Sequence, residues 1–158
     1  MHRMVKPLLE WYGENKRELP WRQDREPYHI WISEIMLQQT RVEAVKEYYI
    51  RFLKHLPEVR ALAQIPDDEL MKLWQGLGYY NRARNLKKAA QVLEQEYQGR
   101  FPEEYELLLQ LPGIGEYTAG AIASSACGKR VPAVDGNVSR IYTRYFADSS
   151  DIMQGKVR

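Results

Sequence analysis

Two acidic side chains in this sequence lie where a carboxylate could do chemistry. Asp135 falls in VPAVDGNVSRI (131–141), directly before Gly136 and a new helical pattern, so on this stretch alone a helix N-cap is the favoured interpretation. Glu34 falls in HIWISEIMLQQTRVEAV (29–45), between apolar neighbours that could desolvate its carboxyl and raise its pKa. A single Glu on a helix usually faces water, so that interpretation stays open as well.

Two carboxyl groups in different surroundings are the usual requirement for cleaving a glycosidic bond. One protonates the leaving group, and the other stabilises or captures the cationic sugar. Glu34 and Asp135 can share this work only if the fold brings them together. The segments between them therefore decide whether they are reagents.

The segment LLLQLPGIGEYTAGAIASSACG (107–128) predicts a short helix, a Gly-x-Gly turn at Gly113 and Gly115, and a second helix rich in small residues. Glycines without a β-carbon let the backbone approach a phosphate closely, and the unpaired N–H groups that open the second helix favour an anion. This helix–hairpin–helix pattern favours binding of a DNA backbone over an incidental turn.

The segment GLGYYNRARNL (76–86) joins two tyrosines and two arginines at a helix start. Aromatic tips beside guanidinium groups suit insertion beside unstacked bases and contact with phosphates. The alternative is that Tyr79 and Tyr80 form a core pair next to a solvated helix. Without the other motifs, that alternative is favoured.

Apolar residues recur at helical spacing through most of the chain, and no alternating strand pattern is convincing. The stretch TRVE (40–43) has the form of a capping box, and Pro57 and Pro66 fit helix starts. A polar, proline-flanked loop over 20–27 separates the first helix from the rest. We therefore expect an all-α protein.

Composition excludes several classes of protein and of site. The net charge of +2 over 158 residues does not by itself indicate a nucleic-acid partner, and the basic segments are explained equally well as solvated helix surfaces. Cys127 is the only cysteine, which excludes an intrachain disulfide and a multi-cysteine metal site within these residues. With no membrane-spanning run and no signal-peptide pattern, the expected location is cytoplasmic.

Taken in order, LPWR, IWISEIMLQQTRV, GLGYYNRARNL, LPGIGEYTAGAIAS and VDGNVSRI resemble the catalytic region of adenine DNA glycosylases of the MutY type. The resemblance covers almost the whole chain, and five ordered motifs are far more specific than any one of them. It implies a helix–hairpin–helix DNA glycosylase of base-excision repair. Such an enzyme is a monofunctional hydrolase that removes adenine mispaired with 8-oxoguanine or guanine in double-stranded DNA.

The same resemblance implies roles for individual residues. Glu34 matches the general acid that protonates adenine, and Asp135 matches the carboxylate that stabilises the oxocarbenium ion, with Tyr117 and Asn137 as its polar neighbours. The implied DNA-binding residues are Arg22 near the adenine pocket, Gln39 and Tyr79 entering the duplex, and Thr40, Arg82, Gly113 and Gly115. The backbone carbonyls of Leu109, Leu111 and Ile114 are implied to bind a monovalent cation that bridges the hairpin to a phosphate.

The resemblance further implies a six-helix, barrel-like domain over 28–135, with the helix–hairpin–helix at 107–127. Residues 1–27 and 136–158 would belong to a second, incomplete helical domain. The family generally holds a 4Fe–4S cluster on four cysteines beyond this region, followed by a C-terminal domain that helps recognise 8-oxoguanine. We therefore expect a piece of a longer protein, iron-free, with weak DNA binding and little or no excision, which self-associates through its N-terminal helix.

Two alternatives remain at this stage. One is a glycosylase of the endonuclease III type with lyase activity, which carries a catalytic lysine where this chain has Tyr117. A phenol cannot form the Schiff base that lyase chemistry needs. The other is a noncatalytic helix–hairpin–helix DNA-binding module, which leaves Glu34 without a role.

Overall fold

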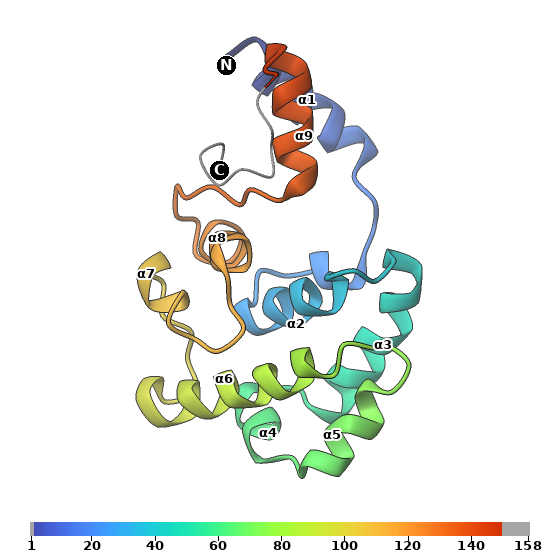
Figure 1. Cartoon of the computed structure of the whole chain (residues 1–158), viewed down its shortest axis with the longest axis vertical. Coiled ribbons are helices and arrows are strands. Elements are labelled where there is room, and N and C mark those ends of the chain that lie inside the picture. The colour runs from blue at the N-terminus through green and yellow to red at the C-terminus, as the bar shows by residue number, and fades with distance from the viewer. Residues whose placement is uncertain (1, 150–158) are drawn as a thin grey trace.

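The computed structural model describes residues 2–149, and every regular element in that range is a helix, which confirms the expected all-α class. The elements are α1 (His2–Asn15), the short 3-10 helix η1 (Pro20–Arg22), α2 (Pro27–Leu37), α3 (Val42–His55), α4 (Val59–Gln64), α5 (Asp67–Trp74), α6 (Asn81–Tyr97), α7 (Tyr105–Leu108), α8 (Glu116–Ser125) and α9 (Gly136–Phe146). Figure 1 shows α2 running through the middle of a helical body, with α8 on one side and α3 and α6 on the other.

Helix α2 is the centre of the core because its sequence is apolar nearly all round. Trp31, Ile32 and Met36 are fully buried, and the buried hydroxyl of Ser33 donates a hydrogen bond of 2.8 Å to the Ile30 carbonyl. Helices α3 and α8 and the short helix η1 all pack against α2. One strip of α2 is left to border open space, and that strip includes Glu34.

Helices α3 to α6 form the half of the body that lies away from α8 in Figure 1. Helix α6 packs closely on α4 because its buried face is rich in alanine, with Ala83, Ala89 and Ala90 all fully buried. Phe52 of α3 meets Trp74 of α5 edge to face, with ring centroids 6.0 Å apart. This packing places the start of α6 close to the end of α2.

The proline-flanked loop between α1 and α2 is anchored in the core. Leu19 and Trp21 are buried, and the Trp21 ring meets Tyr49 of α3 edge to face at a centroid distance of 5.4 Å. Trp21 belongs to η1, which packs on α2 and α3. The neighbouring Arg22 is thereby held beside α2.

Gly120 lets the chain that leads to Asp135 pass directly over α8. A β-carbon at this position would lie 2.1 Å from the Pro132 carbonyl oxygen and 3.1 Å from Cα of Ala133. Ala119, Ala121 and Ala123 are buried on the same short helix, so its small residues allow close packing. Contact at Gly120 therefore sets where the 132–135 backbone lies.

The expected capping box at 40–43 is wrong. Helix α3 begins at Val42 with Arg41 as its extended N-cap residue, and no side chain caps it. The Thr40 hydroxyl instead donates a hydrogen bond of 3.4 Å to the Gln38 carbonyl and accepts one from Arg82. These two hydrogen bonds hold the Thr40 side chain against the end of α2, so it does not cap α3.

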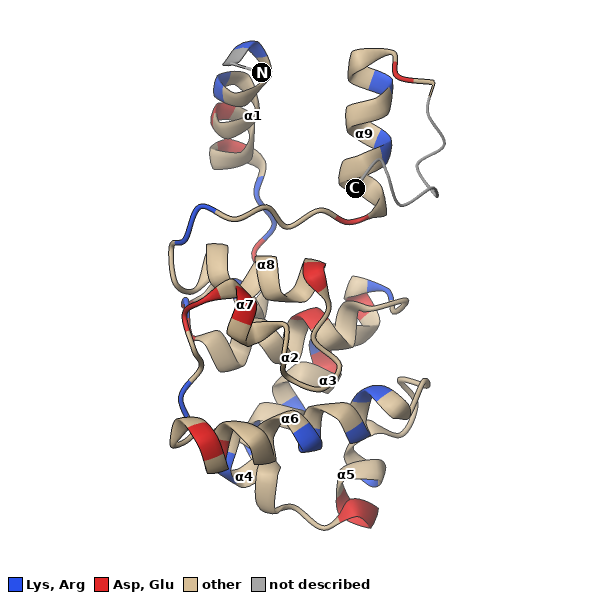
Figure 2. Ribbon diagram, turned by 60° about the vertical axis from the view of Figure 1, so that its left-hand side comes forward, with Lys and Arg blue, Asp and Glu red and all other residues tan. Residues whose placement is uncertain are grey.

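Helices α1 and α9 carry apolar side chains that the described residues leave exposed. Helix α9 has no buried residue, and Ile141, Tyr145 and Phe146 are each more than half exposed. On α1, Leu8 and Leu9 are also more than half exposed. Figure 2 shows the two helices standing apart at one end of the molecule, so neither covers the other.

Candidate active site

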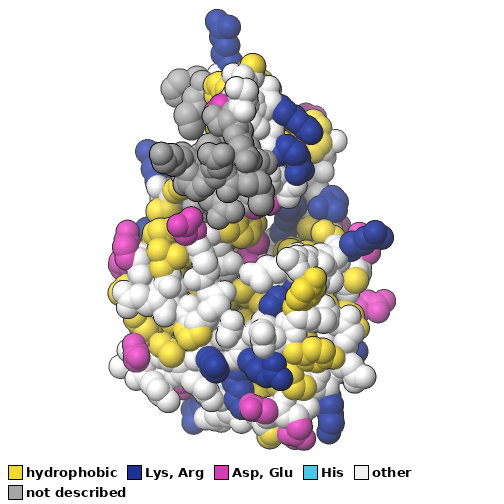
Figure 3. Space-filling view, viewed as in Figure 1, with side chains coloured by type: hydrophobic (Ala, Val, Ile, Leu, Met, Phe, Trp, Pro, Cys, Tyr) yellow, Lys and Arg dark blue, Asp and Glu magenta, His cyan; other side chains and the backbone are white. Residues whose placement is uncertain are grey.

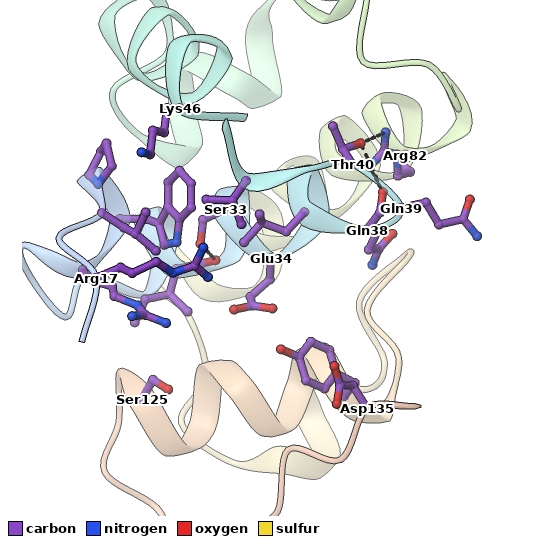
Figure 4. A pocket seen from close by; sticks show the side chains of 18 of the residues that line it. Arg17, Ser33, Glu34, Gln38, Gln39, Thr40, Lys46, Arg82, Ser125 and Asp135 are labelled. Atoms are coloured by element: carbon purple, nitrogen blue, oxygen red, sulfur yellow. Dashed lines mark hydrogen bonds between the residues drawn. The ribbon is translucent and has the colours of Figure 1, made fainter. Parts of the chain in front are cut away.

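One large cleft of about 2130 Å³ gathers most of the residues that the sequence singles out. All four predicted catalytic residues line it, as do five of the seven predicted DNA-binding residues. The other two, Gly113 and Gly115, lie in the hairpin turn outside the cleft. Figure 4 shows Glu34 projecting from α2 and Asp135 lying on the opposite wall.

Glu34 is partly buried on the strip of α2 that also carries Ile30 and Leu37, one helical turn away in each direction. Burial raises the pKa of the Glu34 carboxyl, and the charge of Asp135 raises it further. Hydrogen bonding by Tyr117 and the charge of Arg22 oppose that rise in pKa. The balance favours a carboxyl that keeps its proton to higher pH than an ordinary glutamate, as a general acid requires.

Asp135 is held by both of its carboxylate oxygens. It is the N-cap of α9, where Oδ1 accepts a hydrogen bond of 2.8 Å from the Val138 N–H, so the capping interpretation is confirmed. Oδ2 accepts a hydrogen bond of 2.9 Å from the Asn137 amide. The Asn137 amide oxygen in turn accepts from Arg140 at 2.6 Å, which orients the amide. Capping does not remove Asp135 from the cleft, because the carboxylate still lines it.

The pKa of the Tyr117 hydroxyl is affected by the carboxyl groups of both Glu34 and Asp135. Burial raises the pKa of Tyr117 far above its ordinary range, and the charge of Glu34, hydrogen bonding to Glu34 and the charge of Asp135 add to that rise. Tyr117 lies in the first turn of α8, whose N-cap is Gly115. The phenol is therefore a protonated donor close to both carboxyl groups.

Gln39 and Tyr79 lie on the cleft rim in backbone conformations that few residues adopt. Both are left-handed, with φ of 57° at Gln39 and 47° at Tyr79. Tyr79 is 65% exposed and Tyr80 is 39% exposed, so the interpretation of a core tyrosine pair is wrong. Exposed residues whose backbone is strained in this way are found at ligand-contacting sites.

The Arg82 guanidinium points into the protein. It is half-buried, and its donors reach the carbonyls of Ile35, Met36 and Gln38 at 2.6 to 3.1 Å. It also donates to the Leu77 and Gly78 carbonyls. Its implied role in DNA binding stays a prediction, and this geometry favours an indirect form of it.

The hairpin turn is built for close backbone approach. Gly113 has a φ of +77°, and a β-carbon there would lie 2.7 Å from Cβ of Asn85 on α6. Leu109 is the C-cap of α7, where helix carbonyls carry partial negative charge. The Leu111 carbonyl accepts from the Ile114 N–H, 3.1 Å away. Backbone carbonyls at this turn are the kind of oxygen donor that a hard cation prefers.

Side chains in the described part of the chain form no group of three or more His, Cys, Asp and Glu residues that could hold a metal ion. Cys127 is the only cysteine of the sequence, and a 4Fe–4S cluster needs four thiolates. These residues therefore do not fit such a cluster. No helix among the described residues is long and apolar enough to span a membrane.

The cleft is basic although the chain is nearly neutral. Seven Lys and Arg side chains line it against four Asp and Glu side chains, whereas the net charge of the whole chain is +2. Figure 3 shows Lys and Arg side chains around the hollow below α9. Sequence analysis missed the contribution of Lys16, Arg17 and Lys46, because nothing in their local pattern distinguishes them from solvated surface charges.

Comparison with known proteins gives the family. The HhH-GPD superfamily of base excision DNA repair proteins matches residues 32–158. The chain belongs to this superfamily.

Members of known activity are similar over most of this chain. It is 43% identical over 151 residues to the adenine DNA glycosylase of Buchnera aphidicola subsp. Acyrthosiphon pisum (strain APS), covering 95% of the chain and 43% of that relative. It is 45% identical over 153 residues to the adenine DNA glycosylase of Homo sapiens, covering 91% of the chain and 28% of that relative. The chain therefore spans less than half the length of these relatives.

Solved structures of the superfamily share the fold. A thermostable thymine-DNA glycosylase superposes with a TM-score of 0.88 at 36% identity, covering 94% of this chain and 69% of that one. A trapped endonuclease III–DNA covalent intermediate superposes with a TM-score of 0.80 at 26% identity, covering 94% and 70%. The helix–hairpin–helix glycosylase fold expected for this chain is confirmed.

Proposed function

We propose that this chain carries the catalytic site of an adenine DNA glycosylase, which removes adenine mispaired with 8-oxoguanine or guanine by hydrolysing the N-glycosidic bond. The observation that carries the proposal is the cleft that holds Glu34, with its raised pKa, across from Asp135, with Tyr117 close to both. Similarity to adenine DNA glycosylases supports the choice of base. A noncatalytic DNA-binding module has no use for a carboxyl whose pKa is raised in this way.

The reaction needs adenine outside the helix, because its ring nitrogens and its glycosidic bond are inaccessible in the base stack. Glu34 donates its proton to a ring nitrogen of the extruded adenine as the bond from the sugar carbon to the base breaks. The electron pair of that bond leaves with the base, and the sugar becomes an oxocarbenium ion. Water then adds to the sugar carbon and loses a proton, which leaves free adenine and an abasic site.

Asp135 faces the cation that forms on the sugar. Its carboxylate is fixed in advance by Val138 and Asn137, so little reorganisation is needed when the positive charge develops. Tyr117 lies close enough to Glu34 to lower the pKa of its carboxyl, and it provides no amine for attack on the sugar. The product of this site is therefore an intact strand with an abasic site.

The proposed partner is double-stranded DNA that contains the mispair. The excess of basic side chains around the cleft supports attraction of a polyanion. Structures of endonuclease III with DNA are among those similar to this chain. The hairpin offers the carbonyls of Leu109, Leu111 and Ile114 for a monovalent cation next to a phosphate.

A second proposed partner is another copy of the chain, on the exposed apolar face of α1.

The deciding experiment measures free adenine under single-turnover conditions, with protein in excess over duplexes that contain adenine opposite 8-oxoguanine, guanine or thymine. Excess protein suits this chain because its sequence predicts little or no excision, and single-turnover conditions detect slow release. We expect release from the two mispairs and none from the pair with thymine. Loss of roughly 100-fold or more in Glu34→Gln and in Asp135→Asn is the size expected when one acid–base group is removed.

Two control variants make the same chemical changes outside the cleft. Glu96→Gln lies on α6 and Asp68→Asn lies on α5, and both side chains are exposed. Each control should release adenine at the rate of the unchanged chain. Near-normal release by either active-site variant, or no release by the unchanged chain from any duplex, contradicts the proposal.

A further inference from the structure

Arg82 makes an unusual set of contacts that the proposed chemistry does not use. Its side chain starts in the first turn of α6 and reaches the end of α2, more than forty residues earlier in the sequence. One terminal nitrogen donates to the carbonyls of Ile35, Met36 and Gln38, at 2.9, 3.1 and 2.6 Å. Two of these are carbonyls from the last turn of α2, which have no partner within the helix.

The other terminal nitrogen of Arg82 serves a second loop. It donates to the Leu77 carbonyl at 2.9 Å and to the Gly78 carbonyl at 3.3 Å, and it reaches the Thr40 hydroxyl at 3.4 Å. The guanidinium carbon also lies 5.5 Å from the ring centroid of Tyr79 and 5.4 Å from that of Trp74. One planar group therefore joins two loops that are distant in the sequence.

These contacts flank both left-handed residues of the cleft rim. Gln38 and Thr40, on either side of Gln39, are both bonded to Arg82. The peptides directly before Tyr79 are bonded to it as well, and the Tyr79 ring lies beside the guanidinium. Figure 4 shows the Gln39 side chain projecting away from Arg82, while the Thr40 side chain lies beside it. A left-handed backbone at a residue other than glycine persists only where its surroundings hold it.

We propose that Arg82 is a positioning residue that holds the Gln39 and Tyr79 loops at a fixed separation, so that both side chains can enter the duplex together and drive adenine extrusion. The inference rests on the proposed function for its outcome in DNA, but the loop geometry stands independently of it. A direct phosphate contact is disfavoured, because both terminal nitrogens of the guanidinium already donate hydrogen bonds to protein oxygens. Planarity matters here, since a lysine ammonium cannot span the same acceptors.

The test compares Arg82→Met and Arg82→Lys with a control, Arg51→Met. Arg51 lies on α3 outside the cleft, donates to one carbonyl, that of Leu73, and stacks on Tyr48. The first readout uses the protein without DNA. Amide hydrogen exchange over 37–41 and 76–80 should speed up by about tenfold or more in Arg82→Met, because local opening of these loops no longer has to break the Arg82 hydrogen bonds. The control should leave exchange in both loops unchanged.

The second readout follows extrusion without chemistry. In the Glu34→Gln background, a fluorescent aminopurine in place of the target adenine should brighten when it leaves the stack. Arg82→Met should abolish most of that rise, Arg82→Lys should recover part of it, and affinity for an undamaged duplex should change little. A merely structural role would lower thermal stability but leave extrusion intact in the folded fraction at low temperature.

Three results overturn the inference. The first is unchanged exchange in both loops of Arg82→Met. The second is normal extrusion by that variant. The third is an equal loss of affinity for undamaged duplex with a shallower salt dependence, which would identify Arg82 as a phosphate contact. If the unchanged chain releases no adenine, the proposed function fails, and the exchange measurement still decides the role of Arg82.

Discussion

Replacing Gly120 by alanine tests how the site is assembled, because the change adds one methyl group away from the reacting atoms. The added β-carbon would lie 2.1 Å from the Pro132 carbonyl oxygen, whereas ordinary contact begins at 3.4 Å. Helix α8 and the 132–135 backbone must therefore separate by about 1.3 Å. The obstructing atom belongs to the backbone, so no side chain can rotate away to relieve the clash.

The displacement has a predictable effect on Asp135, which lies three residues beyond Pro132. Tyr117 is carried by α8 and Asp135 by the segment that moves, so the separation changes the geometry between them. A misplacement of about 1 Å costs roughly 100-fold in rate. Overpacking of this kind costs about 1–3 kcal/mol of stability, which a folded domain can survive.

The assay is the single-turnover rate of adenine release, measured beside duplex affinity by fluorescence anisotropy. Gly120→Ala should lose roughly 100-fold in rate, while affinity changes little because the basic side chains stay in place. The control is Gly13→Ala on α1, where an added β-carbon meets nothing within 4 Å. A rate for Gly120→Ala within a factor of about two of the unchanged chain, in protein that melts cooperatively, would refute the argument that this contact positions Asp135.

Three further predictions concern titration, product and assembly. The Glu34 pKa is raised in the folded state, so the contribution of this carboxyl to stability is lost as pH rises from the ordinary carboxyl range through the folded pKa. Thermal melts should therefore show that Glu34→Gln stabilises the protein at neutral pH and does so much less at acid pH. Equal effects at both pH values would contradict the burial argument. Borohydride should trap little of the unchanged chain on DNA, whereas Tyr117→Lys places an amine in the cleft and should give some trapped product; efficient trapping of the unchanged chain would instead identify a lyase. Light scattering should show concentration-dependent self-association that Leu8→Glu with Leu9→Lys removes, and a strictly monomeric unchanged chain would exclude association through α1.

Much of the fold was readable in the sequence because helical periodicity is a local property. The small residues of the 107–128 segment predicted two close-packed helices around a glycine turn, and α7 and α8 lie there, with Gly113 left-handed at the turn between them. Helix α2 was identified as an apolar helix that contains one carboxylate. The local pattern failed at 40–43. The residue types there match a capping box, but the Thr40 hydroxyl bonds to Arg82 of α6 and does not cap α3.

The role of Asp135 shows where local reasoning ends. Its neighbours Gly136 and Val138 are enough to predict an N-cap, and the cap is present. The sequence also supplied the chemical types of Glu34 and Tyr117, but a carboxyl acquires a raised pKa only from the atoms packed around it. That environment comes from helices far apart in the chain, and it depends on a contact at Gly120 that no spacing rule reveals.

Arg82 marks the same division between sequence and tertiary structure. Together with the other motifs, the tyrosines and arginines of 76–86 predict a surface that contacts DNA, because exposed guanidinium groups bind phosphates. Tertiary structure turns this guanidinium inward, onto carbonyls that the end of α2 leaves without partners. The sequence by itself determined the all-helical class, the N-cap at Asp135 and the inventory of reactive groups. The tertiary structure decided which of those groups meet, because burial, charge neighbours and hydrogen-bond partners arise between segments and not within them.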